Sequence, residues 1–423
     1  MRAQKGLSRR AFGRSAVAIG GVAALSACLD RRSDDDIEQG PADLSTLPDR
    51  QHAWNDYLDT DEYDNHVMAE HHVLLQFEYV GSDHDTERDN IETAFETLER
   101  AYVRGNNGLL FTVGYSPTYF ERFDEPLHES VALPAPEALA PFENPIPDSA
   151  DVLVHLASDH PDVVLAAEEA LTGDLDEIND IDVEGTLTDV FVLDERRTGF
   201  VGDGIPAAKQ SEAATVPDSE PVPEDAPLFM GFKSGFRANQ ASEDRVTVPD
   251  GPFAGGTTTH LSRIALNLHQ WYEQDTRRQR VQHMFCPAHA ADERVEGAGH
   301  NLGSNPDVDG CAEDLEADAR MGVVGHNQKL VRAREDGESL LLRRDFNSTD
   351  NSEAGLHFLA HQQRIADFVA VREAMNGTDL ADSGAIGARV NNGILQYLSV
   401  RNRANYLVPP RSHRSLPEPN PAH

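Results

Sequence analysis

Between residues 66 and 202, the spacing of apolar residues predicts four strands and two helices. Strands are expected where β-branched, aromatic and leucine residues run together or alternate with polar ones, at residues 72–79, 108–114, 151–157 and 187–194. Helices are expected where apolar residues recur every three or four positions, at residues 89–104 and 161–171. Ser158 or Asp159 is the expected N-cap of the second helix. The order β-α-β, loop, β-α-β is that of a ferredoxin-like sandwich.

A similar succession follows a proline-rich break. Residues 203–227 hold five prolines among acidic and alanine residues, so we expect a linker or a long surface loop there. Further strands are predicted at residues 257–268, 337–344 and 355–360, and further helices at residues 270–284 and 361–375. The fold class is therefore α+β, with two ferredoxin-like antiparallel halves of the dimeric α+β barrel type, over residues 66–202 and 228–408. Residues 409–423 form a tail.

The first 28 residues are typical of an export signal that ends in a lipid-modified cysteine. Arg9-Arg10 and Phe12 precede an apolar run at residues 16–24, which marks a twin-arginine signal peptide. This run is shorter than the roughly 20 residues that a membrane-spanning helix needs. Residues 25–28 look like a lipobox, so we expect cleavage after residue 27 and lipidation of Cys28. The alternatives are an uncleaved anchor and a chance cysteine.

These features predict a protein anchored by Cys28 to the outer face of the cytoplasmic membrane. Residues 28–65 are polar and lack apolar periodicity, so they are expected to form an acidic tether between the lipid and the folded body.

The chain is strongly acidic, with 73 acidic and 36 basic residues and a net charge of −37. The signal peptide contributes five basic residues and no acidic one, so the mature chain is still more negative. Such charge repels itself unless salt shortens the Debye length, to about 3 Å near 1 M. Acid-rich chains with only four lysines are typical of salt-loving organisms, and a halophilic origin is expected. The charge argues against nucleic acid as a partner, because phosphate binding needs a basic face.

Two cysteines, Cys286 and Cys311, remain beyond the lipobox. Exported thiols are usually oxidised, which favours a disulfide between them. A zinc or copper site is the second interpretation, because His283, His289 and His300 lie nearby in the sequence. The third is a pair of buried, unpaired cysteines.

Five segments resemble a single family when they are taken together in order: residues 71–75, 114–123, 151–171, 255–271 and 355–362. The first is similar to that family's first strand, the second to its Gly-x-Ser segment and the third to its strand–Asp–Pro–helix unit. The fourth looks like its Gly-Gly strand, with Arg263 inside it, and the fifth like its closing strand and Gln-bearing helix. The chain thus resembles the dye-decolourising (Dyp-type) peroxidases, which are haem enzymes built from two ferredoxin-like halves.

This resemblance implies a haem b cofactor and candidate residues that contact it. His326 falls where the family has its proximal histidine, and neutral imidazole is a common axial ligand of haem iron. Arg343 follows at a spacing similar to that of the distal arginine, a residue that stays protonated and presents a fixed fork of donors. Neighbours on a strand point to opposite faces, so Arg343 is preferred to Arg344 as the distal residue. Arg263 and Arg344 are further expected cofactor contacts.

One position departs from the family. Its Gly-x-x-Asp-Gly signature reads Gly231-x-x-Ser234-Gly235 here, and a hydroxyl is a poor substitute for the carboxylate that accepts and returns the peroxide proton. Glu243 and Asp244 follow downstream as other carboxylates.

The expected function is that of a haem peroxidase that reduces hydrogen peroxide at the expense of an organic donor. The alternative is a non-catalytic extracytoplasmic binding lipoprotein that keeps the fold and has lost turnover, which Ser234 favours. A metal-binding protein that uses the region of Cys286 and Cys311 is a third hypothesis. The oligomeric state is open, and a homo-oligomer is compatible with the sequence.

Overall fold

Residues 37–82, 84–307, 311–382 and 384–421 are described by the computed structural model of the chain. The predicted signal peptide, Cys28 and the first part of the predicted tether lie outside these residues.

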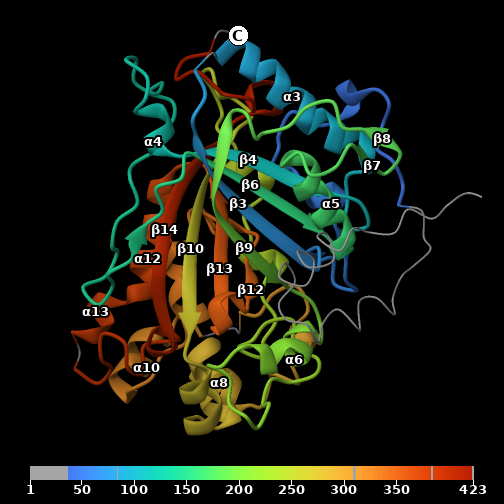
Figure 1. The fold of residues 1–423 in the computed structure, drawn as a ribbon. Coiled ribbons are helices and arrows are strands. Elements are labelled where there is room, and N and C mark those ends of the chain that lie inside the picture. Colours follow the sequence, from blue (N-terminus) through green and yellow to red (C-terminus); the bar gives the residue numbers. More distant parts are fainter. Residues whose placement is uncertain (1–36, 83, 308–310, 383, 422–423) are drawn as a thin grey trace, which may run out of the picture.

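The N-terminal half is an antiparallel sheet with helices on one face. Its main elements are β3 (His71–Tyr79), α3 (His84–Ala101), β4 (Leu110–Tyr115), β6 (Val152–Ser158), α5 (Pro161–Leu171) and β9 (Phe191–Phe200). The strands lie in the order β9-β3-β6-β4, and each neighbouring pair is antiparallel. Figure 1 shows α3 and α5 beside these strands. Val73 and Leu75 of β3 belong to one buried cluster with Phe95 of α3 and Val163 of α5, which holds the layers together.

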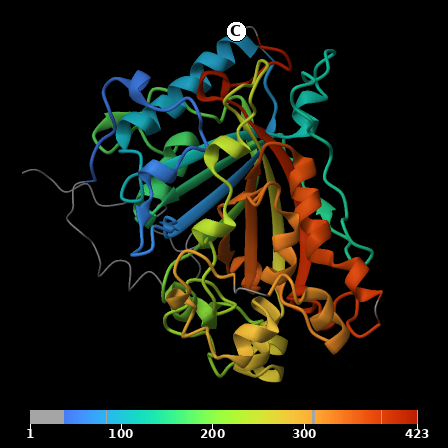
Figure 2. The same cartoon turned by 180° about the vertical axis from the view of Figure 1, so that it is seen from behind.

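The C-terminal half repeats this arrangement. Its main elements are β10 (Thr257–Leu266), β11 (Leu342–Arg343), β12 (Phe346–Ser348), β13 (Gly355–Gln362), α12 (Ile365–Asn376) and β14 (Leu398–Val408). The order β12-β13-β10-β14 places the first and third main strands in the middle, as in the N-terminal half, and β11 also pairs with β13. Helix α12 packs on β10 and β13, and Figure 2 shows it in orange in front of the strands.

The two halves meet edge to edge in one sheet. Strand β12 pairs with β9 at Asn347 and Phe200, and β14 pairs with β4 at Leu407 and Tyr115. Because β10 also pairs with β14, the strands close into a ring. Apolar side chains that include Leu74, Leu261, Phe346 and Tyr406 form a buried cluster between the halves. The predicted fold class, α+β with two ferredoxin-like halves, is confirmed.

Three predicted local details were wrong. The N-cap of α5 is His160, because Ser158 is the last residue of β6 and the carboxylate of Asp159 accepts a hydrogen bond from the Glu70 backbone N–H, 2.9 Å away. Of the predicted strand at residues 337–344, only Leu342–Arg343 is extended and paired in a sheet.

The third detail is the helix predicted at residues 270–284, which is split in two. A π-helix covers Gln270–Gln274 and α8 covers Arg277–Met284. Thr276 starts the second helix as its N-cap, in a reciprocal pair of hydrogen bonds with Gln279.

Strand β14 was not predicted. Its first five residues are only partly buried or exposed, so they lack an apolar face. Its buried part includes the polar residues Arg403 and Asn405, which interrupt the apolar pattern expected of a buried strand.

Two segments, one predicted as a tether and the other as a linker or long surface loop, are packed against the folded body. Within residues 37–65, Trp54 is fully buried in a cluster with Leu110 and Ala157, so this part of the predicted tether is folded. Residues 203–227 contain α6 (Ile205–Lys209), and their Val216 and Val222 are buried against Phe229 and other C-terminal residues.

Short elements complete the described chain. The strands are β1 (Asp59–Thr60), β2 (His66–Val67), β5 (Ile146–Pro147), β7 (Glu177–Ile178) and β8 (Ile181–Asp182). The helices are α4 (Pro117–Phe120), α7 (Glu243–Val246), α9 (Pro287–Ala291), α10 (Leu315–Met321), α11 (His326–Leu330) and α13 (Thr378–Ala381). Among the described residues, no helix combines the length and the apolar character that crossing a bilayer requires.

Candidate functional site

A cavity of about 420 Å³ lies on the α12 side of the C-terminal sheet. Alternate residues of β10, namely Ser262, Ile264 and Leu266, line it from the sheet, and Phe368 and Met375 line it from α12. Among the other sheet, loop and helix residues around it, apolar and polar side chains are about equally numerous. Its size is within the range of small-molecule and cofactor sites, about 300–1,000 Å³.

His326 lines this cavity from the first position of α11. Burial, together with the charges of Lys329 and Arg343, lowers the pKa of its imidazole to about 3, so the ring is neutral at physiological pH. The Nδ1 atom is buried and has no hydrogen-bond partner among the described residues. A neutral imidazole is the form that ligates a metal, although ligating histidines usually donate their second nitrogen to an acceptor.

Contacts from distant segments hold α11 in place. The buried ammonium of Lys329 donates to the carbonyl and side-chain oxygens of Asn392 (3.1 and 2.6 Å) and to the carbonyl of Met375. Gln328 donates from its side chain to the carbonyl of Cys311 and to the carboxylate of Asp318. These bonds fix the position of His326 relative to α12.

Arg343 and Arg344, the two adjacent arginines at the end of β11, have different surroundings. Arg343 lines the cavity, and its proximity is one cause of the low pKa of His326. Arg344 is almost fully buried and donates to Asn55 (2.7 Å), with its guanidinium over the ring of Trp54. Arg344 therefore does not line the cavity with His326.

Arg263 also lies away from the cavity. Because Ser262 and Ile264 face the cavity, the residue between them points to the opposite face of β10. Its guanidinium lies 4.0 Å from a carboxylate oxygen of Glu195, a residue of β9. The sequence could not show which face of β10 meets the helices.

Ser234 lines the cavity, but the two downstream carboxylates do not. Glu243 accepts hydrogen bonds from the backbone N–H groups of Trp54 and Asn55 (2.7 and 2.8 Å), and Asp244 pairs with Arg50.

Asp345 is a cavity residue that the sequence reasoning missed. It follows Arg343 by two positions and lines the same cavity. The sequence held a signal for this residue, because residues i and i+2 of an extended chain point to the same side. The structure thus brings His326, Arg343, Ser234 and Asp345 together.

A second cavity, of about 700 Å³, adjoins the first. Lys233, Ser234, Arg343 and Asp345 line both, so they stand at the junction. The second cavity is lined mainly by polar and charged residues.

A buried charge network borders the first cavity. Glu143 pairs with Arg403 (2.8 Å) and with Arg372 of α12. Burial raises the pKa of Glu143, but the two arginines outweigh burial and hold it below its ordinary value. Two further cavity residues are basic: Arg401 pairs with Glu353 (2.6 Å), and Arg389 donates to the carbonyl of Leu398 (2.7 Å).

Comparison with known families relates most of the chain to a single model. Residues 69–410 match the family of unknown function DUF7405. The chain belongs to this family. No curated protein matches the sequence.

Solved structures that are similar to this DUF7405 member are dye-decolourising, or DyP-type, peroxidases. The encapsulated DyP-type peroxidase from Mycobacterium smegmatis has 12% identity and a TM-score of 0.52, with 84% of this chain and 97% of that chain covered. The dye-decolourising peroxidase from Bacteroides thetaiotaomicron has 12% identity and a TM-score of 0.51, with 85% and 98% covered. A Rhodococcus jostii DypB variant in complex with haem has 14% identity and a TM-score of 0.49, with 82% and 96% covered. At such low identity the likeness shows the fold alone.

Cys286 and Cys311 of this DUF7405 member lie near α11, whose Gln328 donates to the carbonyl of Cys311. Cys286 and Cys311 form a disulfide, which confirms the favoured prediction for this pair. His283 and His300 do not join them: the ring of His283 packs edge-on to Tyr397, and His300 lies 3.6 Å from Asp203. Asp307, which lies close to Cys311 in the chain, pairs with Arg334 (2.7 Å).

Proposed function

We propose that this protein binds haem b in the cavity beside α12 and reduces hydrogen peroxide with electrons from an organic donor. The observation that carries the proposal is the presence of His326, Arg343 and Asp345 around one cavity in a DyP-type fold.

The residues present fit a haem. Apolar side chains such as Ile264, Leu266 and Phe368 suit a porphyrin, and His326 offers a neutral imidazole for iron. Arg389 and Arg401 offer cations for the carboxylates of the haem propionates. When bound, haem supplies the iron that exchanges electrons with peroxide.

The roles of the chain's own residues follow from their chemistry. Arg343, at the junction of the two cavities, binds peroxide and stabilises the negative charge that develops as the O–O bond breaks. The carboxylate of Asp345, two residues away, accepts the peroxide proton and returns it, in place of the acid that the family signature would have at Ser234. The polar second cavity admits peroxide.

The second candidate function is that of a non-catalytic binding lipoprotein on the same fold. Two observations favour it: Ser234 stands where the resemblance expects an acid, and Nδ1 of His326 has no acceptor among the described residues to strengthen it as a ligand.

The location of the protein is part of the proposal. The sequence supports export by the twin-arginine route and anchoring through lipidated Cys28 on the outer face of the membrane. The acidic composition supports a halophilic origin. Radiolabelled-lipid incorporation into wild-type protein, and its loss in a Cys28→Ser variant, tests the anchor.

The decisive experiment is an absorption spectrum of the mature chain, purified at high salt with haem supplied. We expect a Soret band that His326→Ala shifts or removes. His269→Ala, which changes an exposed histidine, is expected to leave the band unchanged. A chain that takes up no haem would rule out the peroxidase proposal and leave the binding lipoprotein.

Ser234→Asp then tests the missing acid. We expect faster peroxide turnover because the variant restores a second carboxylate at the junction of the cavities. A haem-loaded variant with no gain would count against a limiting role for position 234.

A further inference from the structure

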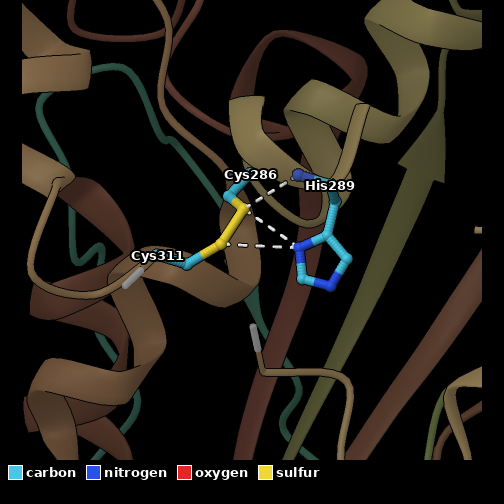
Figure 3. A group of neighbouring side chains, drawn as sticks. All are labelled: Cys286, His289 and Cys311. Carbon is cyan, nitrogen blue, oxygen red and sulfur yellow. Dashed lines mark hydrogen bonds between the residues drawn. A yellow bond between two sulfur atoms is a disulfide. The ribbon is translucent and has the colours of Figure 1, made fainter. Parts of the chain in front are cut away.

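A histidine faces both sulfur atoms of the Cys286–Cys311 pair. Nδ1 of His289 lies 3.0 Å from Sγ of Cys286 and 3.4 Å from Sγ of Cys311 (Figure 3). The three ligand atoms lie within 4.8 Å of one another, and all three side chains are buried. A disulfide does not need this imidazole, so its position calls for a separate explanation.

Local structure positions each of the three side chains. Cys286 is the N-cap of α9, and its sulfur accepts the backbone N–H of His289 (3.5 Å), so the first turn of the helix sets their spacing. The carbonyl of Cys311 accepts a hydrogen bond from Gln328 of α11, which ties the second sulfur to the same region.

The imidazole of His289 has a further partner. Its ring lies near the backbone of Pro306, which lines the same small cavity. Because Nδ1 faces the sulfurs, Nε2 is the nitrogen left for Pro306. An N–H donated to a carbonyl leaves a lone pair on Nδ1, as in histidines that bind metals.

Space is available beside the cluster. His289 and Cys311 line a cavity of about 210 Å³, together with Pro306 and Asp307. The carboxylate of Asp307 is already paired with Arg334 at 2.7 Å. Because Asp307 is already engaged, a water or a small exogenous ligand in this cavity is the remaining candidate for a fourth neighbour of the cluster.

We propose that Cys286, His289 and Cys311 form a redox-gated site for one thiophilic cation, for which Zn²⁺ is the probe. A dithiol reductant opens the site: two electrons and two protons convert the disulfide into two thiols, and the reductant becomes a disulfide in turn. Zn²⁺ then displaces the two thiol protons and binds two thiolates and one imidazole. A disulfide oxidant then takes two electrons from the two thiolates and is itself reduced to two thiols, which re-forms the Cys286–Cys311 disulfide and releases the ion.

The distances agree with this donor set. With Zn–S near 2.3 Å and Zn–N near 2.0 Å, tetrahedral zinc places sulfur and nitrogen ligands about 3.5 Å apart. The two observed nitrogen–sulfur distances, 3.0 and 3.4 Å, are close to this value. Thiolates and imidazole favour Zn²⁺ over Mg²⁺ or Ca²⁺, which prefer oxygen ligands.

The experiment uses the full chain with Cys28→Ser, so that only two thiols are counted. The chain is reduced with dithiothreitol under argon, freed of reductant and titrated with Co²⁺ and then Zn²⁺. Excess Mg²⁺ and high salt occupy the many surface carboxylates. We expect one Co²⁺ per reduced chain with thiolate-to-cobalt charge-transfer absorption, displacement by Zn²⁺, and none of this absorption in the disulfide form.

Matched variants separate the cluster from other histidines. His289→Ala is expected to weaken Zn²⁺ binding at least tenfold, while His300→Ala, which changes a partly exposed histidine outside the cluster, leaves it unchanged. Reoxidation of the wild-type chain is expected to release the metal, which tests the gate without any substitution.

Two outcomes would overturn the proposal. One is a reduced, folded chain with two free thiols that shows no thiolate–cobalt absorption. The other is a His289→Ala variant that binds Zn²⁺ as tightly as the wild type. Neither involves haem, so failure of this site and failure of the peroxidase proposal are distinguishable.

Discussion

Asp345 and Arg343 share a cavity because an extended chain returns to the same side at every second residue. Arg344, between them, does not line this cavity: it is buried against Trp54 and Asn55 and lines only the second cavity. A carboxylate near Arg343 thus comes from the residues that follow β11, whereas the Dyp-type signature that the sequence resembles has its acid at the position of Ser234. A shift of one residue along this extended segment therefore changes which charged side chains line the cavity.

Asp345→Asn should separate proton transfer from haem binding. The amide is nearly isosteric and cannot accept the peroxide proton, so the rate of reaction with peroxide should fall by roughly 10²-fold or more. Stopped-flow absorbance measures that rate, and the Soret band should keep its position and intensity. Asp189→Asn, an exposed substitution in the N-terminal half, serves as the control. An unchanged rate would remove Asp345 from the mechanism.

At the scale of elements, α11 depends on its surroundings for stability. Five residues are too few for a helix to be stable alone. Lys329 and Gln328 bind it to neighbouring segments, and Gly325, which precedes it, lies against the backbone of Phe285. The position of His326 is therefore set by packing rather than by helix propensity.

Gly325→Ala should lower the free energy of unfolding by about 1–3 kcal/mol, the usual cost of overpacking. The added Cβ would lie 1.7 Å from the carbonyl oxygen of Phe285, and the backbone must shift to admit it. Gly387→Ala, whose Cβ would meet its nearest neighbours at 3.5 Å, is the matched control. Urea unfolding measures both, and equal stabilities would contradict the packing assigned to α11.

At the scale of the whole molecule, stability depends on salt through the net charge and on pH through the buried histidines. The net charge of −37 favours expansion at low ionic strength. Several histidines are buried inside the fold, among them His52, His155 and His260. Burial, with help from nearby arginines, lowers the pKa of each of these three to about 3.

Acid should destabilise the protein well above the ordinary range of carboxylate protonation. The unfolded chain binds protons at its histidines near pH 6.5, whereas the folded chain does so only near pH 3 at these three. Stability that is fully present above pH 6.5 is therefore lost as the pH falls toward 3, by up to about 2 kcal/mol for each histidine at pH 5. Urea unfolding at pH 7 and 5 tests this. Equal free energies at the two values would contradict it.

Salt should stabilise the protein. Raising KCl from about 0.1 M to about 1 M shortens the Debye length from about 10 Å to about 3 Å and screens the excess negative charge. We expect the Tm to rise over this range, while an uncharged osmolyte at equal osmolality gives a smaller rise. A Tm that does not respond to KCl would argue against the proposed halophilic origin.

The sequence by itself determined the class and order of most main elements, because strand and helix periods are local, whereas the partly polar pattern of β14 hid that strand. The pattern at residues 72–79 predicts β3 whatever packs against it, and the repeated order of elements leads to two ferredoxin-like halves. The expectation that Arg343 and Arg344 differ in direction also follows from local geometry alone.

Only the tertiary structure decided which side chains share a space. Arg263 was expected at the cofactor site, but the packing of α12 on β10 puts the cavity on the other face. Asp345 lines the same cavity as His326, and His289 meets Cys311, because packing brings separate segments side by side. Such contacts depend on how sheets and helices pack, and hydrophobic burial is non-directional, so no local sequence pattern records them.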